Sequence, residues 1–167
     1  MPAPNRRGYT LIELVVTMLI IGILTSIAVP QYLKTVETGK ADDAVATVNM
    51  IGTTNKMFAL DHSATYVSGA FPAGAGASCG AGVCPAAGPY TACALVFCKY
   101  LADQDWGDKP YTYNACNGAA GGGACAVNLA AVAKRAAAAS APYSGWGYTS
   151  GLSGLITATG AAPPPTF

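Results

Sequence analysis

The feature that most constrains this chain is an apolar segment near its N-terminus. Between Tyr9 and Val29 the sequence holds one charged residue, Glu13, and from Leu14 to Leu33 it runs for 20 residues without any charge. A helix of about 20 apolar residues, rising about 1.5 Å per residue, is long enough to cross the hydrocarbon core of a bilayer. The segment therefore predicts a transmembrane helix over Tyr9–Val29.

Three kinds of membrane-targeting segment fit this pattern. A secretory signal peptide would use Arg6 and Arg7 as its positive end and Ser26-Ile27-Ala28 as a small-x-small cleavage site. A permanent anchor would use the two arginines to hold the N-terminus in the cytoplasm. A third possibility is an anchor whose short leader is cut on the cytoplasmic side of the apolar run.

The lone acid, Glu13, favours the third kind. A carboxylate at bilayer depth costs about 2.5–3.5 kcal/mol, and an ordinary signal peptide has no use for it. Cleavage between Gly8 and Tyr9 would give Tyr9 a new α-amino group, which is positive at neutral pH. Pairing that amine with the carboxylate offsets much of the cost of burying both charges.

Residues Gly8 to Leu14, Gly-Tyr-Thr-Leu-Ile-Glu-Leu, and the apolar run behind them resemble the class III signal of type IV prepilins and type II secretion pseudopilins. That signal usually has a glycine, a phenylalanine and Thr-Leu-Ile-Glu, and Tyr9 takes the place of the phenylalanine. The resemblance implies cleavage after Gly8 by a prepilin peptidase, N-methylation of Tyr9, and pairing of Glu13 with the terminal amine of a neighbouring subunit.

The same resemblance implies partners and a location. The partners are other copies of the chain in a homopolymeric filament, the prepilin peptidase/N-methyltransferase, and a pilus or type II secretion assembly machinery in the inner membrane. The monomer would be a single-pass inner-membrane protein. After assembly it would be part of a cell-surface filament or a periplasmic pseudopilus.

Behind Pro30 the chain keeps a helical pattern. Small and apolar residues recur at helical spacing on one side, at Ala41, Ala44, Val45, Val48, Ile51, Gly52, Phe58 and Ala59. We expect one spine helix over residues 9–60, with its second half packed on the subunit's own head and a kink or local melting at Pro30. The predicted organisation is a leader (1–8), this spine (9–29 in the membrane or filament core) and a head (61–167).

The sequence of the head predicts a small antiparallel sheet of three or four strands, packed on the spine helix. This is an α+β fold. Residues 61–92 are rich in Gly, Ala and Pro and predict a loop, and 91–101 fits a short helix or a strand. The segment Tyr111–Ala115 predicts a strand, and 144–151 and 154–160 predict two more. The alanine-rich segment 126–139 predicts a helix by composition.

Six cysteines lie in the head and predict disulfides behind an export signal: Cys79, Cys84, Cys93, Cys98, Cys116 and Cys125. Their connectivity stays open. Local bridges Cys79–Cys84 and Cys116–Cys125 would close glycine-rich loops, whereas Cys93 and Cys98 would point apart on a helix. A zinc site is disfavoured because there is no Cys-x-x-Cys and His62 is the only histidine.

A second stretch, from Tyr100 to Tyr113 with Trp106-Gly107 and Pro110 inside it, resembles the Trp-Gly and Pro-Tyr region of major pseudopilins. Those proteins tend to bind calcium through late acidic residues. This chain has no Asp or Glu after Asp108, and calcium needs several oxygen ligands. Around Asp103, Asp105 and Asp108, a solvated acidic turn is favoured over a cation site.

Catalysis and nucleic-acid binding are not expected. The chain lacks a phosphate-binding Gly-x4-Gly-Lys motif and a nucleophile–base arrangement, and no cofactor or metal is implied. Loss of Arg6 and Arg7 leaves seven basic against eight acidic side chains, too few cations for strong phosphate neutralisation. The predicted function is a pilin, with a major pseudopilin as the alternative. A secreted disulfide-stabilised binding domain with an ordinary signal peptide is the second alternative.

Overall fold

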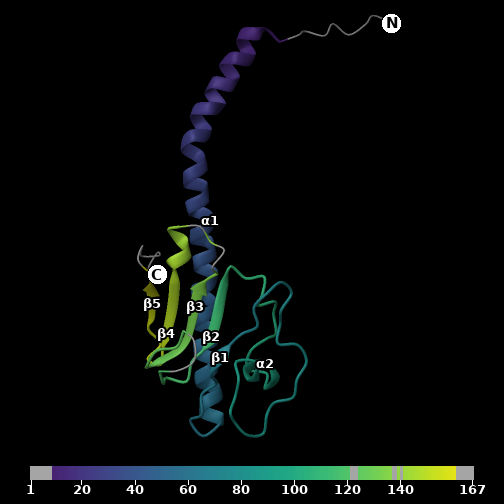
Figure 1. Ribbon diagram of the computed structural model, residues 1–167, viewed down its shortest axis with the longest axis vertical. Coiled ribbons are helices and arrows are strands. Elements are labelled where there is room, and N and C mark those ends of the chain that lie inside the picture. The colour runs from purple at the N-terminus through teal and green to yellow at the C-terminus, as the bar shows by residue number, and fades with distance from the viewer. Residues whose placement is uncertain (1–8, 121–123, 137–138, 140, 161–167) are drawn as a thin grey trace, which may run out of the picture. The chain divides into compact units, whose positions relative to one another are not determined.

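The computed structural model describes residues 9–120, 124–136, 139 and 141–160. The chain folds into one long helix and a five-stranded antiparallel sheet, an α+β arrangement (Figure 1). In chain order the elements are α1 (Leu11–Asp61), β1 (Gly69–Ala70), α2 (Ala94–Phe97), β2 (Tyr111–Ala115), β3 (Leu129–Arg135), the 3-10 helix η1 (Tyr143–Gly145), β4 (Gly147–Gly151) and β5 (Ile156–Thr159). Internal contacts divide the chain into two units between Glu37 and Thr38.

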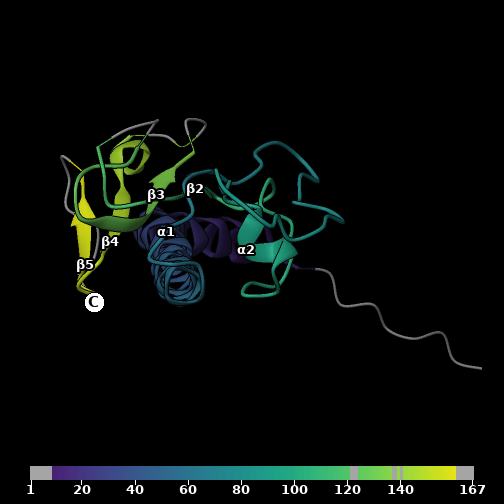
Figure 2. The same ribbon diagram turned by 90° about the horizontal axis from the view of Figure 1, so that it is seen from below.

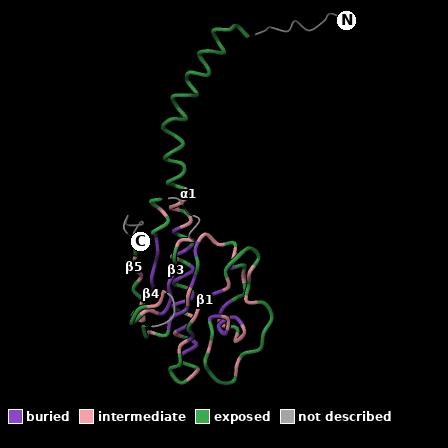
Figure 3. The backbone as a smooth tube through the Cα atoms, in the orientation of Figure 1, coloured by how far each residue is buried: buried purple, intermediate pink, exposed green. Residues whose placement is uncertain are grey.

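The first unit contains the N-terminal part of α1. The helix begins at Leu11 and continues through Pro30, so the local melting expected there is absent. Every residue from Tyr9 to Thr35 is exposed, as the green N-terminal stretch of the tube in Figure 3 shows. Nothing within this unit covers the apolar side chains.

The second unit begins with the rest of α1, which buries one side. The expected stripe is confirmed: seven of its eight members are buried, and Val45 is half-buried. Two polar residues, Thr47 and Asn55, are buried beside them. This side of the helix joins the same apolar core as the sheet residues Tyr111, Tyr113 and Ala133.

The five strands follow one another in space in the order of the sequence, each antiparallel to the next. Ala133 of β3 pairs with Tyr113 of β2 on one side and with Tyr148 of β4 on the other. Tyr148 in turn pairs with Ala158 of β5. Seen from below in Figure 2, α1 lies along β2 and β3. The expectation of three or four strands missed β1, which is two residues long and carries little pattern.

The described residues of the segment 126–139 are not helical, which corrects the expectation from composition. Leu129–Arg135 forms the central strand β3, and Ala130 to Ala133 are all buried. Alanine favours helices in isolation, but here both neighbours on the sheet supply its hydrogen bonds. Small side chains on β3 also suit close contact with α1, since a Cβ on Gly52 would lie 3.7 Å from the Ala130 Cβ.

Aromatic side chains fill much of the core beside the sheet's first strands. Trp106 is 2% exposed, and its ring stacks on Phe71 with centroids 4.1 Å apart. Burial raises the pKa of Tyr113 above the ordinary value and raises the pKa of Tyr148 to about 12. Trp106 is thus one of the buried core residues of the head.

Three disulfides hold the loop-rich part of the head, and their connectivity corrects the local prediction. Cys79 pairs with Cys93 and Cys84 pairs with Cys98, each across 14 positions. Cys93 and Cys98 flank α2, so the segment 91–101 is a short helix. They do not pair with one another, and each is bonded to a cysteine of the preceding loop. Only the third bridge, Cys116–Cys125, joins the neighbours that the sequence suggested.

Candidate functional site

The start of α1 is built by a reciprocal pair of side chains. Glu13 Oε2 accepts hydrogen bonds from the Thr10 backbone N–H and from the Thr10 hydroxyl, each at 2.7 Å. The Glu13 backbone N–H donates to Thr10 Oγ1 at 3.3 Å. This is a capping box, which satisfies donors that the first turn of a helix otherwise leaves without partners. Glu13 therefore already has a structural use within one chain.

Side chains around the capping box gather on one side of the chain because of their spacing. Tyr9, Glu13 and Thr17 are spaced four residues apart, and together with Leu14 they line one shallow hollow on the helix surface. Both hydrogen bonds from Thr10 go to Oε2. Within residues 9–120, no hydrogen bond to the other carboxylate oxygen, Oε1, is found. The acid can thus hold the helix start and still accept another donor.

The rest of the segment is a continuous apolar surface, and its Ser and Thr hydroxyls before Pro30 bond within the helix. The hydroxyls of Thr17, Thr25 and Ser26 donate to backbone carbonyls three or four residues earlier, at 2.7–2.9 Å. Large side chains between Leu11 and Leu33 are all at least 49% exposed. The helix is long and apolar enough to cross a membrane. Such a surface has its polar atoms paired and its apolar atoms available to lipid or to other helices.

The expected cleavage site falls on the boundary of the described residues. Tyr9 lies just before α1 and its side chain is 83% exposed. Gly8, with Arg6 and Arg7, lies outside the described residues. The structure therefore places the Tyr9 side of the predicted scissile bond and not the Gly8 side.

The N-terminal segment matches a known family of protein segments. A family model described as the prokaryotic N-terminal methylation motif matches residues 3–29. This segment is similar to that of type IV pilins. Over 55 residues it is 40% identical to the type IV major pilin protein PilA of Myxococcus xanthus (strain DK1622), a match that covers 33% of this chain and 25% of that relative's length. No solved structure matches the chain.

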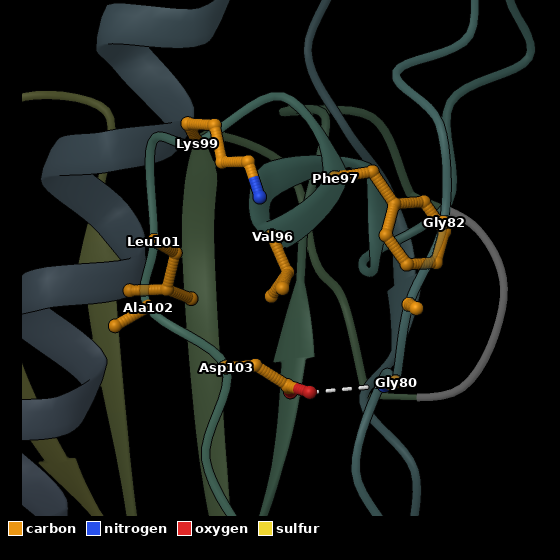
Figure 4. Close-up of a pocket in the computed structure, with 9 residues that line it drawn as sticks. Gly80, Gly82, Val96, Phe97, Lys99, Leu101, Ala102 and Asp103 are labelled. Carbon is orange, nitrogen blue, oxygen red and sulfur yellow. Dashed lines mark hydrogen bonds between the residues drawn. The ribbon is translucent and has the colours of Figure 1, made fainter.

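The carboxylates of the acidic turn, Asp103, Asp105 and Asp108, accept hydrogen bonds from nearby backbone N–H groups. Asp103 accepts hydrogen bonds from the N–H groups of Cys79 and Gly80 at 3.1 and 3.0 Å (Figure 4). Asp105 accepts from Gly107 and Asp108, and Asp108 accepts from Gly76. These three aspartates do not gather at metal-ligand distance of one another within the described residues. Their carboxylates instead order the loop that carries the first two disulfides.

Beside Asp103 lies a cavity of about 240 Å³ between the disulfide loop and α2. Figure 4 shows its lining, with the Phe97 ring over Gly82 and Lys99 on the side away from Asp103. A Cβ on Gly82 would lie 2.5 Å from the Phe97 ring, so a larger residue here would have to displace that ring. The cavity is a packing feature of the loop rather than a collection of chemical groups.

Trp106 and Gly107 have a clear structural task. Trp106 fills the core, and the N–H groups of both residues donate to the Ala77 carbonyl at 2.9 and 3.1 Å. A Cβ on Gly107 would lie 1.4 Å from the Gly74 carbonyl oxygen. The Trp-Gly pair thus holds the disulfide loop by backbone hydrogen bonds and close packing.

Three residues have roles or surroundings here that the sequence analysis did not assign, namely Thr10, Asn55 and His62. The Thr10-x-x-Glu13 spacing before an apolar run is a capping-box pattern and was available in the sequence. Asn55, in contrast, had no local pattern to mark it, because its partners lie in three distant segments. His62 is brought beside Cys84 and Cys98, which its position in the sequence did not indicate.

Proposed function

We propose that this chain is the structural subunit of a type IV pilus-like filament and acts without catalysis. The supporting observation is the exposed apolar helix of residues 11–33, headed by the Thr10–Glu13 capping box and matched by the methylation motif. A surface of this kind is stable in lipid as a monomer and against other helices after assembly. The inner membrane would hold the unassembled subunit, and the cell-surface filament would hold the assembled one.

Processing follows from the same segment. Cleavage after Gly8 by a prepilin peptidase removes Arg6 and Arg7 and leaves a methylated amine on Tyr9. In the filament that amine meets the Glu13 carboxylate of a neighbouring copy, while Thr10 of the same chain keeps its bonds to Oε2. In lipid there is no hydrophobic drive between helices, so assembly depends on helix packing and on this pair. The predicted parts, leader 1–8, spine 9–60 and head 61–167, follow this scheme.

The mass of the N-terminal peptide from native, membrane-extracted protein tests the proposal. The expected peptide begins at Tyr9 and carries one added methyl group. A peptide beginning at Val29 would show cleavage by ordinary signal peptidase. The filament proposal would then be wrong, and a secreted disulfide-stabilised domain would be left.

A major pseudopilin of a type II secretion system is the second candidate. The partial Trp106-Gly107 and Pro110-Tyr111 resemblance favours it, and the absence of acids after Asp108 in the sequence opposes it. Immunogold labelling of whole cells with an antibody to the head separates the two. Labelled surface filaments support the pilus, and label confined to the periplasm supports the pseudopilus.

A further inference from the structure

The fold brings together three groups that the sequence keeps apart, namely the imidazole of His62 and the sulfur atoms of Cys84 and Cys98. One ring nitrogen and the two sulfurs lie within 4.8 Å of one another, and no other such group of three is found among the described residues. In the closed Cys84–Cys98 disulfide the sulfurs are not thiolates and are poor metal ligands. We propose that opening this disulfide creates a binding site for zinc or a similar thiophilic divalent cation, made of two thiolates and one imidazole.

His62 is held as a metal-binding histidine is usually held. Its Nδ1 lies 3.0 Å from the Phe58 carbonyl oxygen, and its ring stacks on the Phe58 ring with centroids 3.9 Å apart. Donation from Nδ1–H to that carbonyl leaves the lone pair on Nε2. A backbone carbonyl in this position fixes both the tautomer and the ring orientation of metal-ligating histidines. The edges of Tyr90 and Tyr100 further restrict the ring.

The surroundings allow the bridge to be reached. Val83, next to Cys84, is 88% exposed, and His62 and Cys98 are half-buried. The Cα atoms of the two cysteines are 4.6 Å apart, which is close enough for both thiolates to bind one ion after the bond opens. Two thiolates, one imidazole and an open fourth position are a ligand set that zinc accepts.

The chemistry balances with one named co-reactant, a dithiol reductant. The dithiol passes two electrons and two protons to the bridge, the S–S bond breaks, and the reductant leaves as its own disulfide. The divalent cation then displaces both thiol protons and forms two metal–sulfur bonds. His62 Nε2 contributes the third bond, and water completes the coordination.

The chain contains a matched control for this site. The Cys79–Cys93 bridge also spans 14 positions and starts in the same loop. The only histidine of the chain lies by the other bridge, so Cys79 and Cys93 gain no imidazole when reduced. Replacing both of these cysteines by serine removes one pair of competing thiols and none of the three proposed ligands.

The test uses the full chain in detergent micelles, reduced with a dithiol, desalted without oxygen and titrated with Co²⁺, which Zn²⁺ then displaces. We expect thiolate-to-cobalt charge-transfer absorption at one Co²⁺ per chain in the reduced wild type and in C79S/C93S. The oxidised protein and C84S should show none. H62A should bind at least about tenfold more weakly, because even changes outside the ligand shell cost about 10–100-fold.

Two results would overturn the proposal. One is H62A binding Co²⁺ as tightly as wild type, which would mean that loose thiols of a disordered loop hold the ion. The other concerns the increase in melting temperature that Zn²⁺ causes. If this increase is no larger for reduced wild type than for reduced H62A, the proposal is wrong, since a ligand of the folded state must stabilise it. Both readouts are independent of filament formation, so they stand apart from the pilin proposal.

Discussion

The side chain of Asn55 joins α1 to Cys116, the residue after β2 and 61 positions later: its Nδ2 donates to the Cys116 carbonyl oxygen at 2.9 Å. The same nitrogen reaches the carbonyls of Ala130 and Val67 at 3.1 and 3.2 Å, and Asn55 Oδ1 accepts from the Val67 N–H at 2.9 Å. Asn55 is 0% exposed. One buried amide thus satisfies backbone groups from the chain before β1, the end of β2 and the start of β3.

Replacing Asn55 by alanine should destabilise the head by about 2–4 kcal/mol, because each buried group left without a partner costs about 1–3 kcal/mol. The measurement is thermal unfolding followed by near-ultraviolet circular dichroism in detergent. Asn49 is exposed on the same helix, so Asn49→Ala serves as the control and should change stability by less than about 0.5 kcal/mol. Equal melting temperatures for the two variants would contradict the role given to Asn55.

Two glycines of α1 should respond in opposite directions to the same change. A Cβ on Gly52 would lie 2.5 Å from Ser150 Oγ, whereas a Cβ on Gly39 would have nothing within 4 Å. Gly52→Ala should therefore destabilise by about 1–3 kcal/mol through overpacking. Gly39→Ala should stabilise the helix by about 0.5–1 kcal/mol. Adding Ser150→Ala to Gly52→Ala should recover part of the loss, and strictly additive effects would argue against direct contact.

The charge of Glu13 and its capping role can be separated by two substitutions. Glu13→Gln keeps an oxygen for the Thr10 donors and removes the charge, whereas Thr10→Val removes the hydroxyl and keeps the charge. If the carboxylate pairs with a neighbour's amine, Glu13→Gln should reduce filament yield strongly while insertion and cleavage stay normal. Thr10→Val should reduce it much less. The measurement is the sheared-filament fraction by immunoblot, and wild-type yield from Glu13→Gln would remove the assembly role.

Tyr148 should make the head lose stability in alkaline solution. Burial raises its pKa to about 12, whereas a tyrosine in the unfolded chain titrates near about 10. Between these values the unfolded chain releases a proton that the folded chain keeps, so stability falls as pH rises, and below the unfolded pKa this loss is absent. Melting temperatures from pH 9 to 11.5 should fall less steeply for Tyr148→Phe, with exposed Tyr32→Phe as the control. Parallel slopes for all three proteins would contradict the assignment.

A structural feature could be predicted from the sequence when the interacting residues are near one another in the chain. The apolar run after Glu13, the helical stripe from Ala41 to Ala59 and the strand Tyr111–Ala115 follow from periodicity and length, and all three are present. The capping box is equally local. These features are decided by neighbours within a few positions, which a single sequence displays.

The tertiary structure decided what depends on distant partners. The Ala130–Ala133 stretch has helical composition and becomes a strand because β2 and β4 take up its hydrogen bonds. Cys79 pairs with Cys93, and Cys84 pairs with Cys98. Each bridge spans 14 positions because the two ends of α2 hold Cys93 and Cys98 near the preceding loop. Asn55 and His62 gain their surroundings in the same way. The sequence by itself therefore determined the membrane-grade helix and the α+β class, while the pairing of strands, cysteines and buried polar groups arose only when folding brought distant segments within bonding distance.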